Sequence, residues 1–192
     1  MNQETITIVS GLPRSGTSMM MKMIQAGGIE PMTDNIRQAD KDNPKGYFEL
    51  EKVKELDKTE DKAWLADAQG KVIKIISQLL KDLPPKFTYK VVFMRRKMKE
   101  ILASQKQMLV RRGEPTDSIS DEELANLFNM HVSQVESWLE EQSNFDVIYV
   151  PYNDAIEKPS KYADDLNNFL GGDLDVGAMT AVVDKSLHRQ RA

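Results

Sequence analysis

Cysteine is absent from the sequence, and histidine occurs only as His131 and His188. Without cysteine the chain has neither disulfides nor thiolate-bound metals, and two histidines are too few for a histidine-rich metal centre. Long apolar runs are also missing, since no stretch approaches the ~20 apolar residues that a membrane-spanning helix needs. The first residues lack a basic segment and enter a strand pattern directly, so we expect no signal peptide and a cytoplasmic location.

An excess of positive charge is missing as well. The formal net charge of −4 argues against a general nucleic-acid binder, which is usually basic. The 192 residues, of which 40% are hydrophobic and 29% charged, are typical of a globular protein with a real core. We therefore expect a single domain over residues 1–192, an enzyme without nucleic-acid or membrane partners.

Strand-like and helix-like patterns alternate along the chain. Strands are predicted at 6–11, 71–76, 89–94 and 146–150, and helices at 18–26, 98–109, 120–139 and 162–170, with a polar helical stretch at about 50–67. Ser120 and Glu123 have the spacing of a capping box. His131 falls on an apolar helix stripe and is predicted to be packed and hydrogen-bonded rather than catalytic. The alternation predicts a three-layer α/β fold with a central parallel sheet and helices on both faces.

The segment between the first strand and the first helix reads GLPRSGTS at positions 11–18. Its two glycines have the separation found in the phosphate-binding G-x-x-x-x-G-K-[ST] loop. Glycines let the backbone turn tightly, and the amide groups at the start of the next helix attract anionic oxygens. The alternative is a tight turn without a ligand. Two glycines, an arginine and three hydroxyl groups in one short segment favour anion binding.

The basic residue of this loop is at an unusual position. Thr17 occupies the position of the lysine that normally reaches the β- and γ-phosphates, and Arg14 lies inside the turn instead. No predicted strand ends in the aspartate of a magnesium site, since the third strand runs directly into Arg95 and Arg96. Transfer of a γ-phosphate depends on such a metal. The sequence therefore predicts an anionic nucleotide held by arginine and backbone amides, without a metal.

The loop and the third strand together resemble sulfotransferases that use 3′-phosphoadenosine 5′-phosphosulfate (PAPS). That family has a P-[KR]-S-G-T-[TS] loop, matched by residues 13–18, and an arginine followed eight residues later by a serine, matched by Arg96 and Ser104. Looser likenesses lie at 43–49, 150–159 and 184–191, so the resemblance covers nearly the whole chain. It implies a P-loop-NTPase-like sulfotransferase architecture with PAPS as co-substrate.

The resemblance assigns the loop to the 5′-phosphosulfate of PAPS. Arg14 would stabilise the negative charge that builds on the leaving oxygen. It cannot act as an acid, because a guanidinium does not give up its proton in proteins. The rest of the loop would bind through amides and hydroxyls, namely Ser15, Gly16, Thr17 and Ser18.

The 3′-phosphate is assigned to residues outside the loop. Arg96 would bind it through charge-assisted hydrogen bonds and Ser104 through its hydroxyl, with Arg95 as the alternative if the register is shifted by one. Three basic residues near the C-terminus would either close over the same phosphate or form a solvated tail, namely Lys185, Arg189 and Arg191.

The base that deprotonates the acceptor is expected to be a carboxylate. Some branches of the family use a histidine shortly after the first helix, and this sequence has none there. Glu49 is the first choice, because a tyrosine and a phenylalanine precede it. Its rivals are Glu30, Asp40, Asp42 and, from the C-terminal segment, His188.

The resulting hypothesis is in-line transfer of a sulfuryl group from PAPS to a hydroxyl or amine of a small-molecule or carbohydrate acceptor. Two alternatives stay open: a P-loop phosphotransferase or NTPase, and a catalytically silent nucleotide-binding module. The segments expected to line the pocket, 29–48 and 111–121, are mostly polar and indicate no particular acceptor. No pattern in the sequence indicates the oligomeric state.

Overall fold

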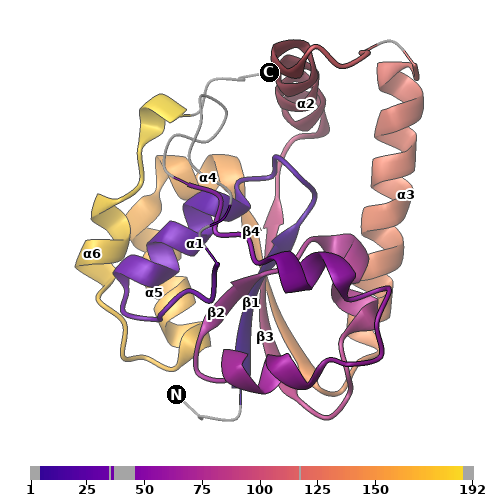
Figure 1. Cartoon of the computed structure of the whole chain (residues 1–192). Helices are drawn as coiled ribbons and strands as arrows, with labels where there is room; N and C mark the ends of the chain where they lie inside the picture. The colour runs from indigo at the N-terminus through magenta and orange to yellow at the C-terminus, as the bar shows by residue number, and fades with distance from the viewer. Residues whose placement is uncertain (1–4, 35, 37–45, 117, 188–192) are drawn as a thin grey trace.

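The structure, a computed structural model, describes residues 5–34, 36, 46–116 and 118–187. Four strands form one sheet: β1 (Thr5–Gly11), β2 (Val72–Lys74), β3 (Thr88–Arg95) and β4 (Phe145–Pro151), in the order β2-β1-β3-β4 (Figure 1). All adjacent strands are parallel, with Gly11 opposite Met94 and Arg95 opposite Pro151. The carboxyl ends of the four strands therefore lie along one edge of the sheet.

The helices of the described residues are α1 (Thr17–Ala26), α2 (Met98–Arg112), α3 (Asp121–Glu140), α4 (Tyr152–Glu157), α5 (Pro159–Leu170) and α6 (Val176–Ala181). Short 3₁₀ helices lie between them: η1 (Glu51–Glu55), η2 (Ala63–Ala68), η3 (Ser77–Asp82) and η4 (Lys185–Leu187). No helix in this part of the chain is long and apolar enough to cross a membrane.

Helices cover both faces of the sheet, as the alternating pattern predicted (Figure 1). Successive side chains of a strand point to opposite faces, so each strand serves two cores. Ile6 and Phe93 belong to the core that packs against η1, η2, η3 and α3. Val9 and Met94 belong to the core that packs against α1, α4, α5 and α6. The three-layer α/β fold with a parallel central sheet is confirmed.

The polar stretch predicted as helical at about 50–67 forms two separate 3₁₀ helices, η1 and η2, instead of one continuous helix. The buried side chains Val53 of η1 and Leu56 directly after it are three residues apart, a spacing that a 3₁₀ helix places on one face. Before the second, the Asp61 carboxylate accepts a hydrogen bond from the Ala63 amide at 3.1 Å. Such local side-chain bonds compete with helix continuation, and composition alone does not reveal them.

The predictions for α3 are confirmed. Its capping box is complete, since Ser120 Oγ accepts from the Glu123 amide at 3.2 Å and the Ser120 amide donates to the Glu123 carboxylate at 3.1 Å. His131 is half-buried and lies 2.8 Å, Nε2 to Oγ, from Ser77 of η3. This histidine therefore ties α3 to the helix that follows β2.

The segments that follow the four strands meet at the carboxyl edge of the sheet. The loop at 11–18 follows β1, Lys74 ends β2, Arg96 follows β3, and Tyr152 begins α4 immediately after β4. In open α/β sheets, this edge is where ligands bind. The fold thus gathers residues from distant parts of the sequence around the loop.

Candidate functional site

The loop at 11–18 packs too closely on its neighbours for its glycines to carry side chains. Gly11 and Gly16 have φ angles of 136° and 102°, in the left-handed region that favours glycine. A Cβ at Gly11 would lie 2.6 Å from the Met94 carbonyl oxygen of β3. A Cβ at Gly16 would overlap the Tyr152 ring of α4. The loop is therefore pressed onto the ends of β3 and β4, which fixes its position.

The loop presents the start of a helix to a cavity. Helix α1 begins at Thr17, and the Met20 amide donates back to the Gly16 carbonyl at 3.2 Å. The first amide groups of a helix have no partner within the helix, and the helix dipole adds partial positive charge there. Gly16, Thr17 and Ser18 all line the cavity. This arrangement suits a phosphate or sulfate group.

Ser15, in contrast, shapes the turn. It is fully buried, and its amide donates to the Leu12 carbonyl at 3.2 Å. Its hydroxyl has no hydrogen-bond partner among the described residues, and a Cβ at Gly11 would lie 2.8 Å from it. Ser15 does not belong to the described lining of the cavity. The side chain of Ser15 is therefore buried beneath the loop backbone, outside the described cavity lining.

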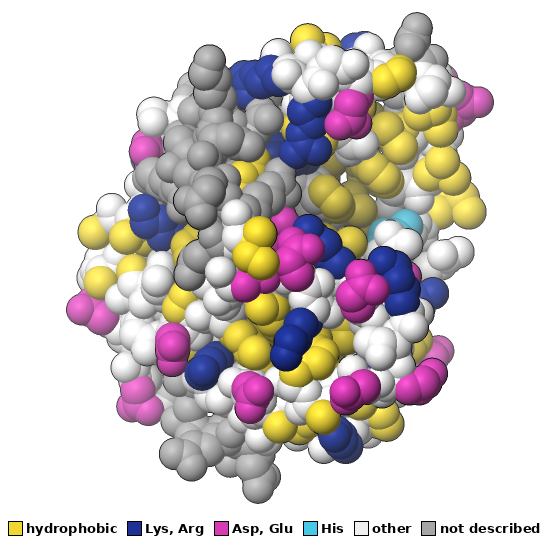
Figure 2. Space-filling view, in the orientation of Figure 1, with side chains coloured by type: hydrophobic (Ala, Val, Ile, Leu, Met, Phe, Trp, Pro, Cys, Tyr) yellow, Lys and Arg dark blue, Asp and Glu magenta, His cyan; other side chains and the backbone are white. Residues whose placement is uncertain are grey.

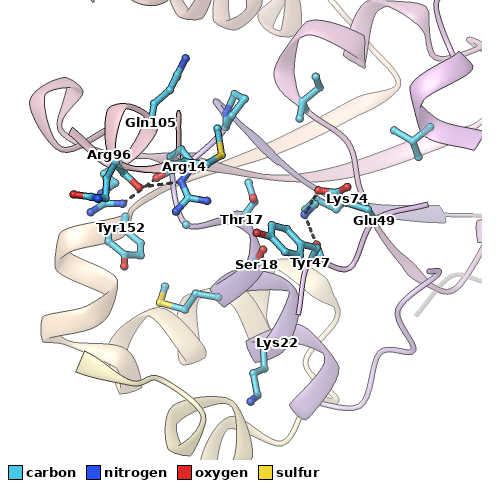
Figure 3. A pocket seen from close by; sticks show the side chains of 18 of the residues that line it. Arg14, Thr17, Ser18, Lys22, Tyr47, Glu49, Lys74, Arg96, Gln105 and Tyr152 are labelled. Atoms are coloured by element: carbon cyan, nitrogen blue, oxygen red, sulfur yellow. Dashed lines mark hydrogen bonds and ion pairs between the residues drawn. The ribbon is translucent and has the colours of Figure 1, made fainter. Parts of the chain in front are cut away.

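Arg96 is anchored by a buried ion pair. Its side chain is 7% exposed, and its Nε donates to the carboxylate of Glu100, which is 1% exposed, at 2.8 Å. The other carboxylate oxygen of Glu100 accepts from Asn153 Nδ2 at 2.7 Å. Arg96 Nη1 donates to the Arg14 carbonyl at 2.9 Å (Figure 3). These bonds join β3, α2 and α4 to the phosphate-binding loop.

Arg14 connects the loop to α2. Its Nε donates to Ser104 Oγ at 2.9 Å, and both residues line the cavity. Arg14 has a φ of 71°, a left-handed conformation that costs a non-glycine residue free energy. The structure thus brings together the loop cation and two residues that the sequence placed far away, Arg96 and Ser104.

Arg95 faces a different part of the molecule. Its Nε donates to Glu136 of α3 at 2.8 Å, and its guanidinium lies 3.9 Å from the centre of the Tyr149 ring. The described lining of the cavity contains Arg96 and not Arg95. Of the two arginines that the sequence left open, Arg96 is the one at the cavity.

Tyr152 forms the floor of the loop and was not singled out from the sequence. Its ring lies beneath Gly16, and the Arg96 guanidinium carbon is 4.4 Å from the ring centre. Burial raises the pKa of the Tyr152 hydroxyl above its usual value of 10, and the charge of Arg96 partly offsets that rise. The signal in the sequence was its place directly after a predicted strand, in the segment 150–159.

Glu49 lies in the cavity wall beside two lysines. Its carboxylate is 3.7 Å from Lys74 Nζ and 4.0 Å from Lys54 Nζ, and its side chain is 20% exposed. Lys74, the last residue of β2, also donates to the Tyr47 carbonyl (Figure 3). Lys74 was missed from the sequence, because it reads as part of a strand. The pairing of β2 with β1 brings its ammonium group to the site.

The remaining candidate residues lie outside the described cavity lining or outside the described residues. Glu30 is exposed, lies 3.9 Å from Lys71 and is outside the described lining. Lys185 is exposed on η4, where the cavity lining contains its neighbour Asp184 instead. Five further candidates lie outside the described residues, namely Asp40, Asp42, His188, Arg189 and Arg191.

The cavity as a whole has a volume of about 620 Å³. One part is bordered by the phosphate-binding loop, Arg96, Ser104 and Tyr152. The other part extends from Glu49 towards α2 and α3 and is bordered mainly by apolar side chains. No group of acidic or histidine side chains among the described residues is arranged to hold a metal ion. The site therefore offers an anion-binding half and an apolar half.

A family model described as "Sulfotransferase domain" matches residues 4–190 of the chain. The match includes the loop, Arg96, Ser104 and Glu49. No curated protein matches the chain.

Three solved structures share this fold. A sulfotransferase from Alicyclobacillus acidocaldarius is 15% identical with a TM-score of 0.53, over 87% of this chain and 81% of that one. The sulfotransferase domain of the Synechococcus PCC 7002 olefin synthase is 15% identical with a TM-score of 0.56, over 98% and 80%. Mouse sulfotransferase SULT7A1, complexed with PAP, is 17% identical with a TM-score of 0.54, over 100% and 68%.

Proposed function

Because the chain belongs to the sulfotransferase domain family, we propose that it transfers a sulfuryl group from PAPS to a hydroxyl or amine of a small molecule. The observation that carries the proposal is the convergence of Arg14, Arg96 and Ser104 on one cavity at the start of α1. A nucleotide with phosphates at both its 5′ and 3′ positions fits two cationic groups and a helix start. The mouse structure of similar fold was determined with PAP, which supports the choice of nucleotide.

The start of α1 holds the 5′ end of the donor in this proposal. The amides of Gly16, Thr17 and Ser18, with the two hydroxyls, surround the phosphosulfate oxygens. Arg14 stabilises the negative charge that develops on the phosphate oxygen as the sulfuryl group leaves. Ser15 contributes by closing the turn, since its side chain is buried beneath the loop.

Arg96 and Ser104 hold the 3′-phosphate in the same proposal. A serine hydroxyl has one proton to donate and lone pairs that accept. Because Ser104 Oγ accepts from Arg14, its proton is directed away from Arg14 and is available to a phosphate oxygen. Arg96 is held in place from behind by Glu100, so its guanidinium is positioned before the nucleotide binds.

Glu49 acts as the base. Its carboxylate accepts the proton of the acceptor hydroxyl while the acceptor oxygen forms a bond to sulfur. The bond between sulfur and the 5′-phosphate oxygen breaks at the same time, leaving a sulfate ester and adenosine 3′,5′-bisphosphate. Lys74 lies 3.7 Å from the carboxylate and holds it at the cavity wall. A positioned base of this kind contributes roughly 10²–10⁴-fold in rate.

Calorimetry with adenosine 3′,5′-bisphosphate tests the nucleotide assignment. We expect binding in the micromolar range, and a loss of about tenfold or more in the Arg96→Gln and Ser104→Ala variants, because each removes a contact to the 3′-phosphate. The matched control is Arg95→Gln, which removes the neighbouring arginine outside the cavity lining. Absence of bisphosphate binding together with tight binding of ATP and Mg²⁺ would refute the proposal in favour of a phosphotransferase or NTPase.

A further inference from the structure

The apolar half of the cavity is built from several separate elements. It is bordered by the loop before η1, η1 itself, the segment from β2 to η3, α2 and α3, through Leu50, Val53, Ile76, Leu79, Met108 and Phe128. Figure 2 shows apolar side chains gathered in a recess beside α3. None of the residues assigned to the donor phosphates lies in this group, so these side chains are available to another part of the bound molecules.

The chemistry of this lining favours an apolar occupant. Apolar side chains that stay accessible gain roughly 25 cal/mol per Å² when a ligand removes them from water. Ile76, which lines the cavity, is 37% exposed, so part of this apolar lining is open to water. A sugar, which carries hydroxyls on every side, would leave this surface poorly matched.

Helix α2 connects the reacting end of the cavity to its mouth. Ser104, Met108, Arg111 and Arg112 all line the cavity from one side of this helix. With a rise of 1.5 Å per residue, Arg111 lies ~10 Å along the helix from Ser104. Arg14 is hydrogen-bonded to Ser104, so the reacting centre lies at the Ser104 end. Arg111 and Arg112 are exposed and lie at the other end.

Basic residues outnumber acidic ones in the described part of the cavity lining. This part contains seven Lys or Arg residues and two acidic residues, Glu49 and Asp184. The donor phosphates engage Arg14 and Arg96 in the proposed function, and Glu49 lies between Lys54 and Lys74. The two arginines at the end of α2 add positive charge beyond what the donor site uses. An anionic group of the acceptor would complement them.

We propose that the acceptor is an elongated, mainly apolar hydroxy compound with an anionic group at the end remote from its hydroxyl. The inference rests on the proposed sulfuryl transfer. The hydroxyl lies between Glu49 and the loop, the apolar body packs on Met108 and Phe128, and the anionic group meets Arg111 and Arg112. The occupant is thus amphipathic, and the ~10 Å along α2 from Ser104 to Arg111 gives the approximate scale of its length.

A matched pair of probe compounds tests the proposal. ω-Hydroxyoctanoate and its methyl ester have the same hydroxyl and the same alkyl chain, and they differ only in the anionic end. We measure their affinities by calorimetry on protein saturated with adenosine 3′,5′-bisphosphate, and their sulfation with labelled PAPS. We expect the acid to bind about tenfold more tightly than the ester, the ratio for one charge-assisted hydrogen bond.

Three variants locate the contacts. Arg111→Gln/Arg112→Gln is expected to abolish the preference for the acid and to leave the affinity for the ester unchanged. Lys106→Gln removes one positive charge from an exposed position of α2 outside the described lining and should keep the preference. Phe128→Ala should weaken acid and ester alike, by about tenfold or more, because it removes apolar contact area.

The outcomes separate this inference from the proposed function. Equal affinities of acid and ester, retention of the preference in the double variant, or tighter binding of glucose than of either compound would overturn the acceptor assignment. In each of these cases bisphosphate binding remains intact. Failure of the bisphosphate itself to bind would overturn the proposed function, and the acceptor inference with it.

Discussion

Arg14 of the phosphate-binding loop donates a hydrogen bond to Ser104 of α2 at 2.9 Å, across 90 positions of the sequence. The carbonyl of the same arginine accepts from Arg96 at 2.9 Å. Side chain and backbone of Arg14 are thus both held, which offsets the cost of its left-handed conformation. The loop, the end of β3 and α2 form one unit, and the residues proposed to bind the two phosphates of the donor touch each other before any donor arrives.

We predict that Arg14→Ala lowers the rate of sulfuryl transfer about 10²–10³-fold, the loss expected when a preorganised donor to a developing charge is removed. Single-turnover kinetics with labelled PAPS measure the rate, and calorimetry with the bisphosphate separates binding from chemistry. Arg14→Lys keeps the positive charge and should retain more activity than the alanine variant. An unchanged rate in Arg14→Ala would remove Arg14 from the mechanism.

We predict that Glu49→Gln lowers kcat roughly 10²–10⁴-fold, because an amide cannot accept the proton of the acceptor. Its affinity for the bisphosphate should not change, since no donor contact is assigned to Glu49. Glu51→Gln is the matched control: Glu51 also pairs with Lys54, at 2.6 Å, but is outside the described cavity lining. Equal kcat values in the two variants would show that the base is another group.

We predict that Glu100→Gln reduces the free energy of unfolding by about 3–5 kcal/mol, because Arg96 would be left buried without its counter-charge. Urea unfolding monitored by circular dichroism measures the change. Glu136→Gln breaks the ion pair with Arg95, whose side chain is 48% exposed, and should cost less than about 1 kcal/mol. Similar losses in the two variants would argue against a special role of the buried pair.

We predict that Gly16→Ala destabilises the protein and weakens bisphosphate binding, because its Cβ would overlap the Tyr152 ring. Gly28→Ala is the control. Gly28 has a similar φ of 109°, but among the described residues, its two chain neighbours aside, no atom lies within 4 Å of the position of a Cβ there, so this variant isolates the backbone cost of roughly 1–3 kcal/mol. We expect Gly16→Ala to cost more than Gly28→Ala in thermal unfolding. Equal losses would mean that the loop does not depend on its contact with Tyr152.

We predict that His131 makes stability depend on pH. Burial, aided by the charge of Lys81, lowers the pKa of His131 below its usual value of 6.5. The unfolded chain therefore binds a proton more tightly than the folded one, and the free energy of unfolding falls as pH drops from 6.5 towards the lowered pKa. Urea unfolding at about pH 7.5 and about pH 5.5 measures the difference. The difference should shrink in His131→Asn, and a difference of the same size would exclude His131 as its source.

The features that the sequence predicted are those encoded over short distances. Two glycines, a basic side chain and hydroxyls next to a strand pattern identify the loop, because such a pattern depends on local backbone geometry that a few neighbouring residues determine. The capping box of Ser120 and Glu123 could be predicted for the same reason. Arg96 and Ser104 were indicated by the resemblance to PAPS-using sulfotransferases, through their spacing after the third strand.

The features that were missed depend on how distant segments pair. Lys74 looks like any strand residue until β2 is placed next to β1, which brings its ammonium to Glu49. Tyr152 becomes the floor of the loop because β4 pairs with β3 and α4 starts immediately afterwards. Ser15 and Thr17 both carry hydroxyls in the loop, but only Ser15 is fully buried, and its hydroxyl lies close to Gly11.

The position of the Tyr152 ring beneath Gly16 also has a consequence for biosynthesis. A chain grows from its N-terminus and folds as its segments emerge, so the loop leaves the ribosome long before α4 does. Until β4 and α4 are in place, Gly16 lacks the Tyr152 ring beneath it and Glu100 lacks the hydrogen bond from Asn153. We therefore expect a half-made chain to bind the proposed sulfuryl donor poorly. Among the described strands, β4 is the last to be synthesised, so the proposed nucleotide site is complete only once that strand has joined the sheet.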